Sequence, residues 1–145
     1  MNIIEGIRNY IGNMDCMATF NTAINVNYLD SGIDSFSIEE VPCEPILKKY
    51  VGGKAKRQFQ FVFCSREPYS NEILQNIENS SFYEDFANEI ESKNNSDDLP
   101  VIDDIESSSI EVTSSAYTVS TEEDTSMYQI NLNFKYRKWG IKLWE

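Results

Sequence analysis

The chain contains no histidine, so the side chains available for chemistry are carboxylates, three cysteines and a cluster of cations. Without histidine the commonest general base and metal ligand is missing, and nucleophile systems of the Ser-His-Asp and Cys-His types are excluded. Cys16, Cys43 and Cys64 are odd in number and widely spaced, which predicts neither a disulfide framework nor a metal site. We expect three thiols that act as small apolar side chains in a reducing cytoplasm.

The carboxylates give no clear site either. Asp97, Asp98, Asp103 and Asp104 surround the LPVI segment but lack the alternating ligands and the glycine of a calcium loop, so a solvated acidic loop is expected. Sequence leaves open a pair of carboxylates assembled in space for glycoside hydrolysis, although no aromatic pattern typical of carbohydrate sites accompanies them. The two glycines of VGGKAK lie between strands, which disfavours a phosphate-binding loop. We therefore expect no catalytic, metal or cofactor site and no enzyme.

The cations are concentrated in one short stretch. Residues 48–66 hold six of the 12 Lys and Arg residues of a chain whose formal net charge is −12, and residues 67–124 carry 16 acidic residues against Lys93 alone. A free DNA-binding protein needs a broad positive face, whereas two surfaces of opposite sign favour contact with another protein or another copy. The candidate interface residues are Lys48, Lys49, Lys54, Lys56 and Arg57. A solvated hairpin tip whose lysines guard a strand edge stays an open alternative.

The first third of the chain predicts one helix followed by strands. Isoleucines at helical spacing predict a helix in residues 2–14. In residues 23–29, Ile24, Val26 and Tyr28 alternate with asparagines, which indicates a half-buried strand. A second strand is expected in residues 35–41 after a turn at 30–34.

Residues 46–66 predict a β-hairpin. Residues 46–51 form the first strand, GGKA the turn and residues 56–66 the second strand, in which Phe59, Phe61 and Phe63 share one face. Because three phenylalanines on one face indicate contact with the core, this strand should lie inside the sheet.

A helical stripe follows, and then more strands. Residues 67–95 read as two consecutive helices, or one interrupted near Ser80, with Ser81 and Glu84 spaced as a capping box. The stripe consists of Ile73, Leu74, Ile77, Phe82, Phe86 and Ile90. After a polar acidic loop at 92–109, strands are expected in residues 109–119 and 126–138, joined by a turn at 120–125.

This element order predicts an α+β fold in which a mainly antiparallel sheet is packed by an N-terminal helix and a central helical segment. We expect a single domain over residues 1–145, ending in a tail at 138–145, with no signal peptide and no membrane span. The opposite face of the sheet, rich in Asn, Gln, Thr and charges, should meet water or a hydrophilic partner. The expected core comprises Ile7, Phe59, Phe61, Phe63, Phe82, Phe86, Ile130, Leu132 and Phe134.

Several ordered segments carry a resemblance to a known family. The sequence VPCEPILKKYVGGKAKRQFQFVFCSREPYS, then QNIENSSFYEDFANEIE, LPVI and IEVTSSAYTVSTEEDTSMYQINLNFKY resemble the small tail proteins, often labelled minor capsid proteins, of phages and prophages of Gram-positive bacteria. The resemblance spans roughly residues 22–137 and rests on no single diagnostic motif. The helix at 2–14 and the tail WGIKLWE depart from it.

That group is similar to the tail-terminator, or tail-completion, proteins. The resemblance implies a sandwich of the tail-terminator type and a structural protein that is made in the bacterial cytoplasm and lies in the neck region of the virion tail. It implies a ring, typically a homohexamer, that caps the head-proximal end of the tail tube, stops tube polymerisation and docks the connector. The implied partners are other copies of the chain, the tube protein, the connector or neck protein and, in a contractile tail or tail-like bacteriocin, the sheath. DNA would be met only by passage through the lumen.

Two other functions stay open. The chain could be a head–tail connector or neck protein, because such rings share fold and symmetry. An acidic inhibitor or immunity protein that mimics DNA is an alternative of another class, which the lysines of 48–57 disfavour. In a ring, each subunit offers one surface to a different surface of its neighbour, so opposite charges on two flanks would be complementary. We expect the basic hairpin to contact a subunit or the tube rather than line the lumen.

Overall fold

A computed structural model describes residues 2–18, 24–29, 35–68, 73–121 and 125–139. The elements follow the order α1 (Ile3–Gly12), η1 (Asp15–Met17), β1 (Ile24–Val26), β2 (Ser35–Glu40), β3 (Ile46–Lys49), β4 (Lys54–Pro68), α2 (Ile73–Asn95), β5 (Ile105–Val112), β6 (Tyr117–Thr121) and β7 (Thr125–Trp139). The fold is mixed α+β with a largely antiparallel sheet and two α-helices, as the element order predicted.

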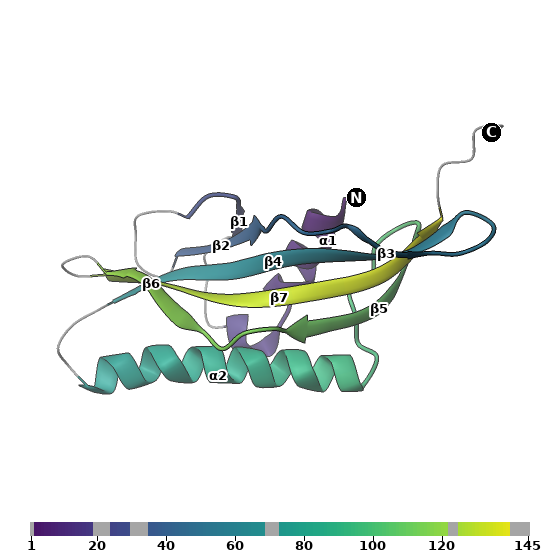
Figure 1. The fold of residues 1–145 in the computed structure, drawn as a ribbon. Coiled ribbons are helices and arrows are strands. Elements are labelled where there is room, and N and C mark those ends of the chain that lie inside the picture. The colour runs from purple at the N-terminus through teal and green to yellow at the C-terminus, as the bar shows by residue number, and fades with distance from the viewer. Residues whose placement is uncertain (1, 19–23, 30–34, 69–72, 122–124, 140–145) are drawn as a thin grey trace.

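The sheet is built around two long central strands. Its main path is β1-β2-β4-β7-β5, with β3 also paired to β4 and β6 to β7. Only β1 and β2 pair in parallel among the described strands. Strands β4 and β7 are 15 residues long and pair along their whole length, so they form the backbone of the sheet. Figure 1 shows them running across the molecule with α2 below and α1 behind.

Both α-helices pack against one face of the sheet, where the core lies. Phe36, Phe63 and Phe86 stack at its centre, with ring centroids 5.6 Å and 4.8 Å apart along the stack. Of the residues expected in the core, Phe59 and Phe82 are half-buried at its border. The others are buried: Ile7, Phe61, Phe63, Phe86, Ile130, Leu132 and Phe134.

The predicted hairpin at 46–66 is confirmed as β3 and β4. The chain reverses through Gly52 and Gly53, whose φ angles of +97° and +93° are accessible to glycine without the usual steric cost. The Tyr50 N–H donates to the Lys54 carbonyl at 2.7 Å and closes the turn.

The predicted interruption of the helical segment near Ser80 is wrong. Residues 73–95 form one continuous helix, and Ser81 and Glu84 lie within it instead of capping a new one. No proline or glycine interrupts this segment, so nothing breaks its backbone hydrogen bonds. Ile77, placed in the stripe by the sequence, is 52 % exposed, and Tyr83 is buried instead.

Strand β1 is shorter than predicted. Ile24 is buried, but Val26 and Tyr28 are 38 % and 63 % exposed. Asn27 has a φ of +54°, a left-handed conformation that ends the strand, so period-two alternation does not extend to Tyr28. The turn predicted at 30–34 lies outside the described residues.

The strand predicted at 109–119 is two strands. β5 begins earlier, at Ile105, and the ladder breaks at 113–116 before β6 resumes. At the break, Thr113 N–H donates to the Asn131 carbonyl and the Ser114 hydroxyl accepts from Asn131 N–H, so these two groups replace the regular pairing. Strand β7 runs to Trp139, two residues into the segment predicted as a tail. The rest of that tail and the tip of the turn at 120–125 lie outside the described residues.

Close packing of α1 gives a first testable prediction. A Cβ on Gly6 would overlap Cγ1 and Cδ1 of Ile102, whereas a Cβ on Gly12 would meet only Ile24 Cδ1, at 3.9 Å. We expect Gly6→Ala to lower the free energy of unfolding by up to about 2 kcal/mol, because an overpacking cost of about 1–3 kcal/mol outweighs the gain of about 1 kcal/mol in helix propensity. Urea denaturation should show no such loss in the control, Gly12→Ala.

A double-mutant cycle tests the cause of that loss. If overlap with Ile102 is responsible, Gly6→Ala combined with Ile102→Ala should cost less than the sum of the two single changes. Strictly additive losses would contradict the contact between α1 and Ile102.

Candidate interaction surface

The sheet face that α1 and α2 leave uncovered is polar. Strand registers place Gln58 beside Lys135, Gln60 beside Asn133 and Cys64 beside Gln129 on this outer face. The amides bond to one another: Asn133 Nδ2 donates to Gln58 Oε1 at 3.1 Å. A hydrophilic face of this kind was predicted from the alternation of the strands.

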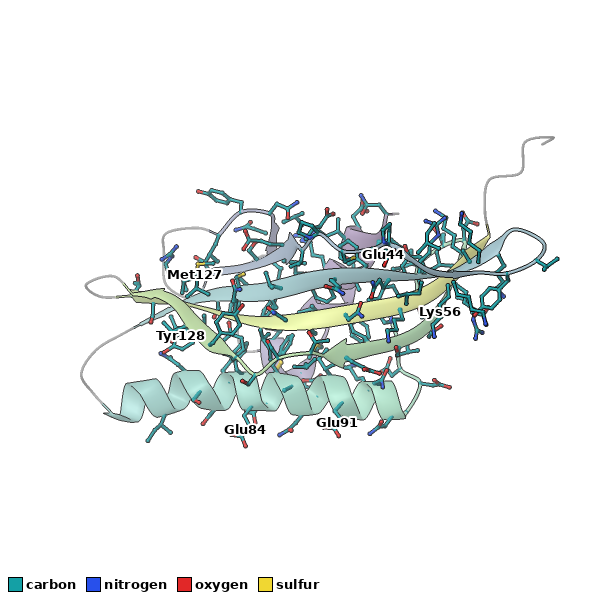
Figure 2. The ribbon with its side chains drawn as sticks, in the orientation of Figure 1. Glu44, Lys56, Glu84, Glu91, Met127 and Tyr128 are labelled. Atoms are coloured by element: carbon teal, nitrogen blue, oxygen red, sulfur yellow. The ribbon has the colours of Figure 1, made fainter. Side chains whose placement is uncertain are left out.

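Cations gather at one end of the outer face. The register aligns Lys48 of β3 with Lys56 of β4, and Lys56 with Arg137 of β7. Lys54 lies two residues before Lys56 on β4, and Lys135 lies two residues before Arg137 on β7, so both are on the same face. We call Lys48, Lys54, Lys56, Lys135 and Arg137 the cationic patch; Figure 2 labels Lys56 within it.

In the part of the chain that the structure describes, one carboxylate, that of Glu106, lies within ion-pair distance of this patch. Glu106 of β5, opposite Arg137, accepts a hydrogen bond from Lys54 Nζ at 2.9 Å and lies 3.8 Å from the Arg137 guanidinium. The hydrogen bond from Lys54 and its charge lower the pKa of Glu106, and Arg137 adds to the effect. Among the described residues, no carboxylate lies within ion-pair distance of Lys48, Lys56 or Lys135. The patch therefore keeps an excess of positive charge.

The registers separate the five cations predicted from sequence. Lys48, Lys54 and Lys56 come together in the patch. Lys49 pairs with Ala55, and Arg57 pairs with Ile46 and Tyr136, so these two side chains point to the opposite side of the sheet. Arg57 Nε is buried with no hydrogen-bond partner among the described residues. Lys135 and Arg137 belong to the patch but were not singled out, although their alternation with Phe134 and Tyr136 already assigned them to the outer face.

The acidic side of the molecule lies on α2 and on the edge strand β5. Glu84, Asp85 and Glu91 are exposed on α2, and Glu111 is exposed on β5. Figure 2 labels Glu84 and Glu91 on α2. Glu89 instead accepts from the backbone N–H groups of Asp15 and Cys16 and ties η1 to the helix. The chain thus presents two surfaces of opposite sign on different elements.

Cys64 is buried and Cys16 is half-buried, and each of these thiols lies beside a carboxylate. Cys64 Sγ donates to Glu39 at 3.0 Å, and burial, with this carboxylate, raises the pKa of the thiol well above its usual range. Burial and the charge of Glu89 raise the pKa of Cys16 to about 12. Both thiols are thus protonated at neutral pH and are poor nucleophiles.

The described residues contain neither a cluster of metal ligands nor a membrane-spanning helix. In the described ranges no three His, Cys, Asp or Glu residues gather as a metal site would require. No helix in that part of the chain combines the length and apolar character that crossing a bilayer needs.

Comparison with known proteins gives no family assignment: no family model matches the chain, and no curated protein matches its sequence.

Proposed function

We propose that this protein is a structural subunit of a phage or phage-like tail, which forms a ring at the head-proximal end of the tail tube, ends tube polymerisation and docks the connector. The resemblance over residues 22–137 supports this role, as does an α+β fold with the expected order of elements. The role needs no catalytic group, and the ring is proposed to be a homohexamer with the tail-terminator type of sandwich.

The row of like charges in the cationic patch carries the proposal. Lys48, Lys56 and Arg137 lie directly opposite one another on three adjacent strands. Like charges in such positions disfavour strand pairing by roughly 0.2–1 kcal/mol for each pair. An acidic surface placed over the row would offset that cost, so the arrangement favours a bound partner.

A ring made of copies of the chain supplies such a partner. In a closed ring each subunit presents one surface to a different surface of its neighbour. The cationic patch and the acidic residues of α2 lie on different elements, which makes them suitable as the two halves of one repeated contact. The tube, the connector and, in a contractile tail, the sheath would meet the remaining surfaces.

The cationic patch disfavours the acidic inhibitor, because a mimic of DNA needs a continuous negative surface. A connector, which lies one layer above the terminator, forms the same kind of ring. The experiment below distinguishes the connector role from the terminator role.

Negative-stain electron microscopy of particles from an induced strain lacking this gene tests the function. We expect abnormally long tubes without heads, because nothing would stop tube growth. Tails of normal length beside separate filled heads would contradict termination and assign the protein to the connector layer. Intact particles would contradict both positions.

A further inference from the structure

A groove runs between α2 and the edge strand β5, away from the cationic patch. It consists of two adjoining hollows of about 540 and 420 Å³, which share Ala87 and Val112 as lining residues. Tyr83, Ile90 and Ile110 add apolar wall, and three carboxylates line it: Glu84, Glu91 and Glu111. Among the described residues that line the two hollows, none is a lysine or an arginine. The groove therefore fits an apolar segment that also carries positive charge.

On the outer edge of β5, one outward-pointing backbone N–H group is hydrogen-bonded and the next one is not. Ile110 N–H points away from β7 and donates to Asn94 Oδ1 of α2 at 2.9 Å. Because outward-pointing groups recur every second residue, Val112 N–H also points to the groove, and the described residues offer it no acceptor. An extended chain entering beside Val112 can use this free donor.

We propose that the groove receives residues 140–145 of a second copy of this chain, a contact that rests on the ring proposed above. The segment GIKLWE contains Ile141, Leu143 and Trp144 beside Lys142, and only Lys138 and Trp139 separate it from Arg137 of the cationic patch in the chain. Its apolar side chains match the wall of the groove, and its lysine matches the rim carboxylates.

Geometry favours a neighbour over the chain's own groove. Lys138 pairs with Ile105, whereas Val112 pairs with Leu132, so β7 leaves the sheet at the end remote from Val112. Returning from Ile105 to Val112 takes about 23 Å along the strand, which uses nearly the whole extended length of the seven residues that follow Lys138, about 23–25 Å. The segment would also have to reverse direction first.

Charge exchange between groove and segment tests the proposal in the full-length protein. We expect Glu91→Lys to weaken self-association about tenfold in sedimentation velocity, because it puts a lysine on the rim that Lys142 approaches. Asp85→Lys is the control, since Asp85 is exposed on the same helix but does not line the groove. Combining Glu91→Lys with Lys142→Glu should restore most of the lost affinity.

A peptide experiment separates binding to the groove from ring formation. The probe is a labelled peptide of residues 137–145, and the receiver is the full-length chain with Ile141→Ser and Leu143→Ser, which keeps its own segment from competing. Fluorescence anisotropy should show saturable binding that Glu91→Lys weakens about tenfold and Asp85→Lys leaves unchanged. A peptide of the same composition in scrambled order should not bind.

The outcomes distinguish this proposal from the function itself. Equal binding of the two peptides, no binding of either, or equal effects of Glu91→Lys and Asp85→Lys would overturn the groove contact even if rings form. Peptide binding with the expected dependence on Glu91, together with intact particles after gene deletion, would support the contact between copies and overturn the role in the tail.

Discussion

Phe63→Ala is expected to lower the free energy of unfolding by about 3–5 kcal/mol. Phe63 is completely buried on the central strand β4, and its ring stacks between Phe36 and Phe86, so truncation removes contacts to β2 and α2 together. Because domains of this size are stable by about 5–15 kcal/mol, the change should remove roughly a fifth or more of the stability. Urea denaturation followed by circular dichroism measures it.

Phe59→Ala is the matched control for this prediction. Phe59 lies on the same strand and the same face but is only half-buried at the border of the core. Its replacement should therefore cost less than half as much. Equal losses at the two positions would contradict the placement of Phe63 at the centre of the core and Phe59 at its edge.

Most of the fold could be predicted where one local pattern decides the structure. The helix at 2–14, the hairpin at 46–66 and the strand at 126–138 each have a periodicity that only one burial pattern explains. The break between β5 and β6 could not be predicted in the same way. It depends on bonds from Thr113 and Ser114 to Asn131 of β7, which a local pattern does not reveal.

In helix α2, a local pattern predicted a boundary that the structure does not have. Ser80 and Ser81 resemble a boundary in sequence, since serine favours helix ends and the spacing to Glu84 fits a capping box. In the structure the stripe of Tyr83, Phe86 and Ile90 packs on the sheet as part of one helix. Tertiary packing, which stabilises most helices in proteins, overrides the local signal.

The candidate site could be predicted only in part, for a related reason. The charge cluster at 48–57 is visible in the sequence, but the faces of its members depend on the register of β3, which shifts between Ile46 and Lys48. That irregularity puts Lys48 beside Lys56 and leaves Lys49 opposite Ala55. The contribution of Arg137 depends on pairing with a strand some 80 residues distant in the chain, which no short-range pattern encodes.

The cationic row leads to a prediction in which stability and assembly change in opposite directions. Lys56 lies between Lys48 and Arg137, so Lys56→Glu replaces two like-charge neighbours by two opposite-charge neighbours. We expect the free energy of unfolding of the isolated chain to rise by up to about 1 kcal/mol. The same change should weaken ring assembly by about 2–3 kcal/mol, roughly a hundredfold, because it puts a carboxylate against the acidic surface of the neighbour.

Lys49→Glu provides the control, since Lys49 lies on the same hairpin but opposite Ala55, on the other side of the sheet. It should leave assembly nearly unchanged when subunit association is measured by sedimentation velocity and stability by urea denaturation. A more stable Lys56→Glu chain that assembles normally would remove the patch from the interface, and a less stable chain would contradict the register of the three strands.

A row of like charges kept at a cost to stability is expected only where function requires the charges, because selection retains such residues despite their cost. A gain in stability together with a loss of assembly in Lys56→Glu would therefore show that the lysines form an interface. Lysines that only protect the edge of a hairpin would not give both effects.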